Sequence, residues 1–166
     1  GGKRSMIKFK AGSAEETTGL GEKLGRLLQK GDTVCLTGEL GTGKTAFTGG
    51  IARALEIEGY ITSPTFTIVN EYHEGRVPLY HFDVYRIGSP EEMYEIGFEE
   101  YLAGDGVVII EWAELIESIL PEQYISVKIE RDEKNLQDGR WITFDFKGPR
   151  YKGYDEKFEA ELQAEI

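Results

Sequence analysis

The sequence predicts an α/β fold, in which a mostly parallel sheet carries helices on both faces and has an antiparallel edge. Strand-like and helix-like runs alternate along most of the 166 residues, which is typical of this class. The continuous β-branched run Val107–Ile110 indicates a strand that is buried on both faces of a parallel sheet. Near the end of the chain, Tyr124–Arg131 and Arg140–Phe146 are two successive strand-like runs, which indicates the antiparallel pair.

The predicted elements of the first half surround a glycine-rich turn. Met6–Phe9 is a short first strand. Ser13 and Glu16 form a capping box that begins a helix, and leucines at helical spacing follow them. Thr33–Thr37 is an apolar strand that leads directly into the glycines, and Thr45–Leu55 is the helix after them. This half therefore predicts strand, helix, strand, glycine-rich turn and helix, in that order.

The second half predicts further strands and shorter helices. Thr65–His73 and Pro78–Ile87 are strand candidates. Pro90 begins a helix, because proline suits the first turn and the two acids after it favour a helix N-terminus. Ala113–Ile119 is a short helix that stops before a proline. The acidic segment Gly153–Ile166 is expected to be a loosely attached helix.

Length and composition exclude several classes of protein. A chain of this length predicts about one domain that needs no disulfide or structural metal to fold. The longest run without a charged residue, Gly59–Asn70, is shorter than the roughly 20 residues of a membrane-spanning helix. Cys35 is the single cysteine, which fits a reducing cytoplasm, so a cytoplasmic location is expected. His73 and His81 have no metal-ligand spacing with it, so a zinc site is not expected.

Charge is distributed unevenly. The formal net charge is −11, and residues 89–122 hold ten carboxylates with no Lys or Arg. A protein that binds tRNA or DNA by itself needs a large basic surface, so unaided nucleic-acid binding is not expected. The acidic stretch has two readings: a solvated helical face, or a docking surface for a basic partner.

The most specific signal is a phosphate-binding loop (P-loop). The pattern G-x-x-x-x-G-K-[ST] is matched in full between a predicted strand and a predicted helix, as its mechanism requires. Glycines let the backbone approach phosphates, the helix N-terminus faces them, and Lys44 adds a charge at the β/γ end. The fold is therefore expected to be P-loop NTPase-like, with ATP as ligand. The predicted nucleotide-binding residues are Glu39, Leu40, Gly41, Thr42, Gly43, Lys44, Thr45 and Ala46.

Two carboxylates end apolar strands near this loop. An acid after four buried apolar residues is costly to bury without a cation, so Glu111 is expected to face Mg²⁺. Asp83 has the same position in its strand, but it is also expected to pair with nearby Arg86 if its role is only structural. The predicted metal ligands are these two acids and the Thr45 hydroxyl. The catalytic candidates are the same two acids and Thr65. Thr65 follows Pro64 on a loop that is either switch-like or a simple turn.

Four blocks together resemble the TsaE (YjeE) family of small bacterial P-loop ATPases. Besides the P-loop, they are Ser63-Pro64-Thr65-Phe66, His81-Phe82-Asp83-Val84-Tyr85-Arg86 and Ile110-Glu111-Trp112. The resemblance implies a role in forming threonylcarbamoyladenosine at position 37 of tRNAs that read codons starting with A. It implies binding to a TsaB–TsaD-type complex, with contact to tRNA only through that complex and none with DNA or membrane.

The resemblance also assigns roles to residues of this chain. Lys44 and Thr45 would serve phosphate and magnesium, Glu111 magnesium, and Asp83 the magnesium–water region. Arg140 would lie in a late segment that approaches the nucleotide. The expected organisation is then residues 1–12 as an N-terminal scar (Gly1–Gly2) and first strand, 13–147 as the ATPase domain, and 148–166 as an acidic tail.

Two alternatives to this function remain at this point. A P-loop small-molecule kinase needs arginines on a lid, and residues 87–127 contain no Lys or Arg. A nucleotide-gated adaptor that hydrolyses ATP very little uses the same site. GTPase and transporter motifs (N-K-x-D and L-S-G-G) are absent from the sequence. Whether Arg86 or a residue of a partner completes the catalytic site stays open.

Overall fold

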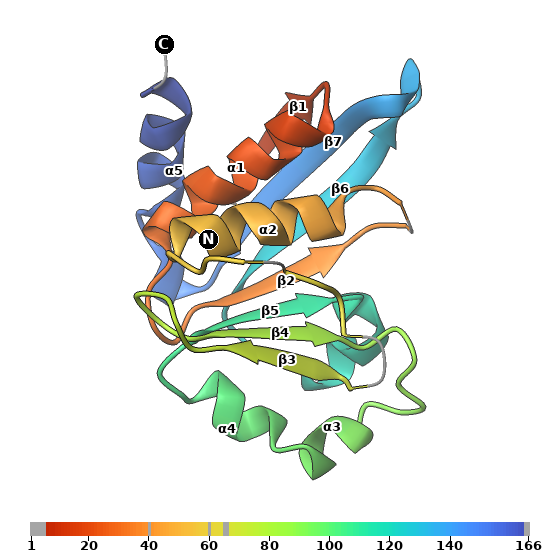
Figure 1. Ribbon diagram of the computed structural model, residues 1–166, viewed down its shortest axis with the longest axis vertical. Helices are drawn as coiled ribbons and strands as arrows, with labels where there is room; N and C mark the ends of the chain where they lie inside the picture. Colours follow the sequence, from red (N-terminus) through yellow and green to blue (C-terminus); the bar gives the residue numbers. More distant parts are fainter. Residues whose placement is uncertain (1–5, 40, 60, 65–66, 165–166) are drawn as a thin grey trace.

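One sheet organises the part of the chain that the computed structural model describes, which is residues 6–39, 41–59, 61–64 and 67–164. Its seven strands lie in the order β1-β7-β6-β2-β5-β4-β3 (Figure 1). No helix within these residues is long and apolar enough to cross a membrane. The elements are β1 (Met6–Ala11), α1 (Ala14–Leu27), β2 (Thr33–Thr37), α2 (Lys44–Ala54), β3 (Val69–Tyr72), β4 (Leu79–Asp83), α3 (Glu92–Glu95), α4 (Phe98–Leu102), β5 (Val107–Glu111), the 3-10 helix η1 (Ala113–Ile119), β6 (Tyr124–Asp132), β7 (Asn135–Lys147), the 3-10 helix η2 (Pro149–Tyr151) and α5 (Tyr154–Gln163).

The four central strands β6, β2, β5 and β4 are parallel, which confirms the predicted fold class. Their register places Leu36 and Asp83 on either side of Glu111, so the carboxyl ends of three strands meet. The antiparallel edge predicted from the last two strand runs is present, and β1 extends it by pairing with β7. The opposite edge is also antiparallel, because β3 pairs with β4.

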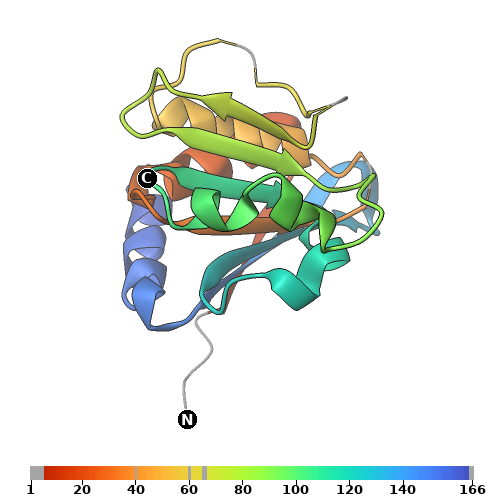
Figure 2. The same ribbon diagram turned by 90° about the horizontal axis from the view of Figure 1, so that it is seen from below.

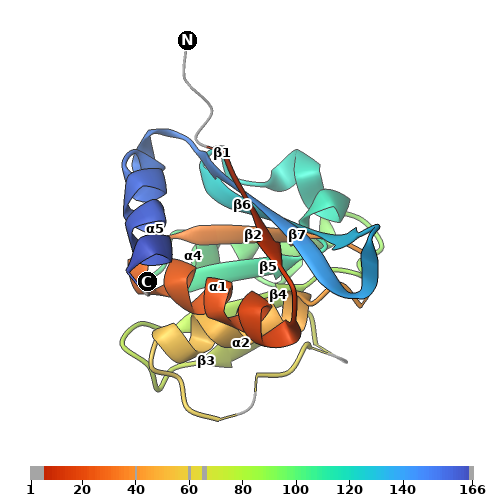
Figure 3. The ribbon, with the colours of Figure 1, turned by 90° about the horizontal axis from the view of Figure 1, so that it is seen from above.

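Helices cover both faces of the sheet, as predicted. Alternate residues of each strand point to opposite faces, so the strands contribute to two separate apolar clusters. The first cluster includes α1, α2 and α5 and buries Leu24, Ile51 and Phe158 against the sheet (Figure 3). The second lies under α3, α4 and η1 and buries Phe98 and Ile116 (Figure 2).

The position of α2 depends on its close contact with α1. A side chain at Gly50 of α2 would place its Cβ 2.0 Å from the Thr18 carbonyl oxygen of α1. Only a residue without a side chain allows the two backbones to approach this closely. Because Lys44 begins α2, this contact helps to place the start of α2, and with it the P-loop, over the carboxyl ends of the central strands.

Three elements differ in extent or continuity from the sequence-based expectations. The strand predicted over Pro78–Ile87 is β4, which ends at Asp83. The helix predicted from Pro90 is two short helices, α3 and α4, because the chain turns at Gly97 with a φ of 76°. The strand predicted over Thr65–His73 is β3, which spans only Val69–Tyr72, and positions 65 and 66 lie outside the described residues.

The C-terminal segment is helical, as expected, but it is not loosely attached. Phe158 on α5 is fully buried, and its ring lies 4.5 Å from that of Phe144 on β7. The buried carboxylate of Asp32, just before β2, accepts hydrogen bonds from Arg150 Nε and from the Tyr154 hydroxyl, both at 2.9 Å. The prediction of loose attachment relied on the many acidic residues of the segment. It overlooked the apolar face of α5, formed by Tyr154 and Phe158, which packs into the first cluster.

We expect replacement of Phe158 by alanine to destabilise the protein strongly. Truncation of a fully buried aromatic side chain costs about 3–5 kcal/mol of unfolding free energy, because it removes apolar contacts and leaves a cavity. Urea denaturation of Phe158→Ala measures this loss, with the exposed neighbour changed in Glu159→Ala as the control. Equal midpoints for the two variants would contradict the packing of α5.

A second prediction concerns Tyr151, whose hydroxyl accepts from the Thr33 amide at 2.9 Å. Burial raises the pKa of Tyr151 to about 12. In the unfolded chain a tyrosine ionises near pH 10, so between about pH 10 and 12 the unfolded state loses a proton that the folded state keeps. Over this pH range the free energy of unfolding of the wild type therefore falls by up to about 1.4 kcal/mol per pH unit because of Tyr151. A variant without this hydroxyl lacks that contribution.

The measurement is urea denaturation of wild type and Tyr151→Phe from pH 8 to 11. We expect the variant to be less stable at pH 8, because it lacks the hydrogen-bond acceptor. The difference in unfolding free energy between wild type and variant should narrow above about pH 10. Tyr94→Phe is the control, because Tyr94 is 48% exposed. A difference that stays constant across this range would show that Tyr151 ionises normally in the folded protein.

Candidate functional site

The P-loop connects the end of β2 to the start of α2. Gly43 is the residue before α2 and has a φ of 109°, a left-handed conformation that favours glycine. No side chain within the described residues caps this helix, so its first amide groups remain available. An uncapped helix N-terminus at the carboxyl ends of parallel strands is well suited to bind phosphate.

Lys44 lies between the P-loop and Trp112, which follows β5. Its Nζ donates to the Gly38 carbonyl oxygen at 2.6 Å and lies 3.3 Å from the centre of the Trp112 ring. Burial lowers the pKa of the Lys44 ammonium, and the charge of Glu111 opposes this shift. The ring of Trp112 therefore lies over the P-loop lysine.

Other predicted nucleotide-binding residues shape the loop. Thr42 is 2% exposed, and its hydroxyl donates to the Glu39 carbonyl oxygen at 2.8 Å. Arg140 on β7 donates from Nε to the Thr42 carbonyl oxygen at 2.8 Å and from an Nη to that of Gly41 at 3.3 Å. Arg140 therefore supports the loop from the β7 side, and its direct contact with a nucleotide stays a prediction. Leu40 lies outside the described residues.

The two predicted carboxylates are neighbours. Asp83 and Glu111 are register partners at the ends of β4 and β5, and Glu111 is 2% exposed. Partial burial raises the pKa of the Asp83 carboxyl, as does the charge of Glu111, whereas a hydrogen bond from the Tyr85 amide lowers it. Among the described residues no ion pair joins Asp83 to Arg86, whose side chain is exposed, so the structural alternative for Asp83 is not found and its role at the metal stays a prediction.

His81 is a site residue that the sequence reasoning missed. It is fully buried, and its Nε2 lies 2.5 Å from Glu111 Oε2. An Nε2–H that donates to the carboxylate leaves Nδ1 as the acceptor nitrogen, and Nδ1 has no hydrogen-bond partner among the described residues. The available signal was the strand period of two, which puts positions 81 and 83 on the same face of the sheet.

Hydroxyl groups join the P-loop to the same carboxylate. The Thr45 hydroxyl lies 3.4 Å from Ser63 Oγ, which in turn donates to Glu111 Oε2 at 3.4 Å. Thr65, the predicted switch residue on this loop, lies outside the described residues. Ala46 lies in the first turn of α2 and lines an open groove of about 660 Å³ along the outer side of that helix. That groove is larger than a second pocket, of about 500 Å³, beside the P-loop, but neither Asp83 nor Glu111 lines the groove.

The donor set fits a magnesium–nucleotide complex better than a metal bound by protein alone. No group of three or more His, Cys, Asp or Glu side chains that could hold a metal occurs in the described part of the chain. Mg²⁺ usually takes only one or two carboxylates and completes its shell with water and phosphate, which matches Thr45 beside Glu111 and Asp83. A pocket of about 500 Å³ adjoins the P-loop and Trp112.

Comparison with known proteins shows the family. The sequence model for "Threonylcarbamoyl adenosine biosynthesis protein TsaE" matches residues 11–141. The tRNA threonylcarbamoyladenosine biosynthesis protein TsaE of Bacillus subtilis is 42% identical over 89% of this chain and 90% of its own length. That of Treponema pallidum is 47% identical over 79% of this chain and 94% of its own.

A solved structure agrees with these sequence matches. The crystal structure of Bacillus subtilis YdiB superposes with a TM-score of 0.82 at 36% identity, covering 98% of this chain and all of that one. The resemblance inferred from the four sequence blocks is thus confirmed by sequence and by fold. On these grounds the chain belongs to the TsaE family of threonylcarbamoyladenosine biosynthesis proteins.

Proposed function

We propose that this protein is a Mg²⁺-dependent ATPase that binds a TsaB–TsaD-type complex and supports threonylcarbamoyladenosine formation at position 37 of tRNA. Family membership supports the pathway. One observation supports the chemistry: an uncapped α2 N-terminus and Lys44 lie at the same end of the sheet as Asp83 and Glu111. Phosphoryl transfer requires this combination of phosphate binding, cation binding and water positioning.

Each part of the site has a distinct task in this proposal. The amides of the P-loop and Lys44 hold the β- and γ-phosphates, and Thr45 and Glu111 hold the cation between them. When bound, Mg²⁺ neutralises charge that develops on the phosphate oxygens. Asp83 is half-buried beside Glu111, so it is placed to orient the attacking water.

His81 keeps the cation-binding carboxylate in place. A carboxylate buried to the extent of Glu111 is costly unless hydrogen bonds or charges compensate it. The His81 ring supplies one such hydrogen bond from the neighbouring strand and so fixes the direction in which the Glu111 oxygens point. Outer groups of this kind commonly orient the ligands of a metal.

The site is short of cations for the γ-phosphate. Lys44 is committed to the P-loop, and Arg140 is held by loop carbonyls. Arg86 is exposed and unpaired with Asp83, so it is the internal candidate. A cation supplied by a partner can raise phosphoryl-transfer rates by roughly 10³–10⁵-fold, so we propose that the isolated chain is slow and that its partner changes the rate.

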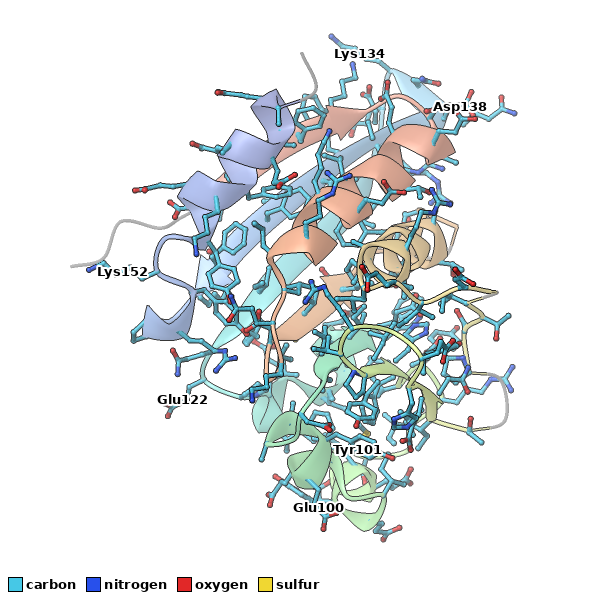
Figure 4. The ribbon with its side chains drawn as sticks, turned by 60° about the vertical axis from the view of Figure 1, so that its left-hand side comes forward. Glu100, Tyr101, Glu122, Lys134, Asp138 and Lys152 are labelled. Carbon is cyan, nitrogen blue, oxygen red and sulfur yellow. The ribbon has the colours of Figure 1, made fainter. Side chains whose placement is uncertain are left out.

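The structure offers a surface for that partner. All of the carboxylates in residues 89–122 except Glu111 are exposed, and they lie on α3, α4, η1 and their flanking loops, on the face opposite α2 (Figure 2). Glu100 and Glu122 on this acidic face lie away from Lys134 and Asp138 at the tip of the β6–β7 hairpin (Figure 4). The acidic face consists of Glu91, Glu92, Glu95, Glu99, Glu100, Asp105, Glu114, Glu117 and Glu122.

Lys44→Ala tests the nucleotide site. We expect it to weaken binding of Mg²⁺–ATP by about 10- to 150-fold, because a contact of a charged group worth about 1.5–3 kcal/mol is lost. Isothermal titration calorimetry with a non-hydrolysable ATP analogue measures this. Lys152→Ala, in the exposed turn before α5 (Figure 4), is the charge-matched control. Unchanged binding and turnover in Lys44→Ala would place the nucleotide elsewhere.

The partner prediction uses steady-state ATP hydrolysis with the TsaB–TsaD complex titrated in at low and moderate salt. We expect a slow basal rate, a higher rate with the complex, and weaker activation at moderate salt, because salt screens exposed charges. Reversing charges on the acidic face, in Glu95→Lys with Glu99→Lys, should weaken activation without changing the basal rate.

The matched control reverses two carboxylates on α5, in Glu156→Lys with Glu159→Lys, which are exposed but lie outside the acidic face. A fast basal rate that neither the complex nor salt alters would favour Arg86 acting within the chain. ATP binding that changes affinity for the complex with no hydrolysis would favour the nucleotide-gated adaptor.

A further inference from the structure

Ser63 lies between Thr45 and Glu111, two of the three predicted magnesium ligands, although it belongs to neither the P-loop nor a strand. Its Oγ is 3.4 Å from Thr45 Oγ1 on α2 and 3.4 Å from Glu111 Oε2 on β5. Because the Ser63 hydroxyl donates its single proton to the carboxylate, the Thr45 hydroxyl must be the donor in the other contact. Ser63 Oγ therefore keeps one lone pair free, and it lies within 3.4 Å of an oxygen of each of these two ligands.

The spacing of these oxygens suits one octahedral cation. Mg²⁺ binds oxygen at about 2.0–2.1 Å, so adjacent ligands of one ion lie about 2.9 Å apart and opposite ligands about 4.1 Å apart. Both Ser63 distances fall between these values, so each of them fits a pair of oxygens that bind the same ion.

The position of Ser63 is set from outside the P-loop. The preceding residue, Thr62, has its carbonyl oxygen bound by Asn70 Nδ2 at 3.0 Å, and its amide donates to the Tyr72 hydroxyl at 3.4 Å. Asn70 and Tyr72 belong to β3 at the sheet edge. The segment after α2 returns along that helix before it reaches β3 (Figure 1). This arrangement anchors Ser63 to the sheet and not to the nucleotide loop.

We infer that Ser63 Oγ is a further protein ligand of the nucleotide-bound magnesium ion, beside Thr45 and Glu111. This inference rests on the proposed ATPase function. It assigns to Ser63 the role of an oxygen donor to a divalent cation.

The experiment measures divalent-metal binding in the presence of a non-hydrolysable ATP analogue. Mn²⁺ titration followed by electron paramagnetic resonance is expected to show about tenfold weaker binding for Ser63→Ala, the low end of what groups around a metal contribute. Ser63→Thr keeps the hydroxyl and should bind normally. Thr62→Ala is the matched control, because its exposed side chain is on the same loop. Analogue binding in EDTA should be equal in all of them.

Ser63→Cys separates direct ligation from a structural role. A thiolate is a poor ligand for Mg²⁺ and a good one for Cd²⁺, so the ratio of Cd²⁺ to Mg²⁺ affinity should rise at least about tenfold over wild type. A residue that only stabilises the loop would leave this ratio unchanged, and that result would overturn the inference. Glu111→Gln is the reference that must weaken Mn²⁺ binding.

The outcomes distinguish this inference from the function on which it rests. Weakened Mn²⁺ binding in Glu111→Gln with normal binding in Ser63→Ala refutes Ser63 as a ligand and leaves the ATPase proposal intact. Absence of Mn²⁺ or analogue binding in the wild type refutes both. Weakened binding in both variants, with a raised Cd²⁺ preference in Ser63→Cys, supports the assignment.

Discussion

The site depends on one buried carboxylate. Glu111 is 2% exposed at the end of the central strand β5, where an ionised group without compensation would destabilise the fold. Three neighbours compensate the buried charge of Glu111. His81 on β4 and Ser63 on the loop before β3 form hydrogen bonds with it, and Lys44 on α2 supplies a positive charge. The strand order, the tight α1–α2 contact and the route of the chain after α2 all bring those groups to one place.

Much of this site was predictable because its signals are local. The P-loop is a contiguous pattern between a strand and a helix, and Glu111 and Asp83 each end an apolar run. The rule that parallel strands present their carboxyl ends at one edge then brings the two acids together. The sequence alone was therefore sufficient to place both acids at the P-loop edge of the sheet, whereas their adjacency depends on the pairing of β4 with β5.

The remaining features depend on long-range packing. From the sequence, His81 looks like a core residue, and only the register of β4 with β5 places it beside Glu111. Ser63 looks like part of a turn, and only the contacts of Asn70 and Tyr72 with the preceding residue fix its position. The C-terminal segment was misjudged for a similar reason. Its net charge indicated a solvated helix, whereas Phe158, one turn after Tyr154, forms an apolar face that only the sheet reveals. The break at Gly97 is different, because it is local: glycine readily adopts the left-handed conformation that separates α3 from α4.

The Asp32 contacts also constrain the order in which the chain can fold during synthesis. The strand that leads into the P-loop is anchored by Arg150 and Tyr154, which are 118 and 122 residues further along the chain. The first strand, β1, must likewise wait for β7 before it has a partner. A nascent chain on the ribosome therefore exposes the first apolar cluster until the last helix emerges. The first apolar cluster is therefore complete only after α5 has formed, and a chain truncated before α5 would expose part of this cluster and be open to aggregation.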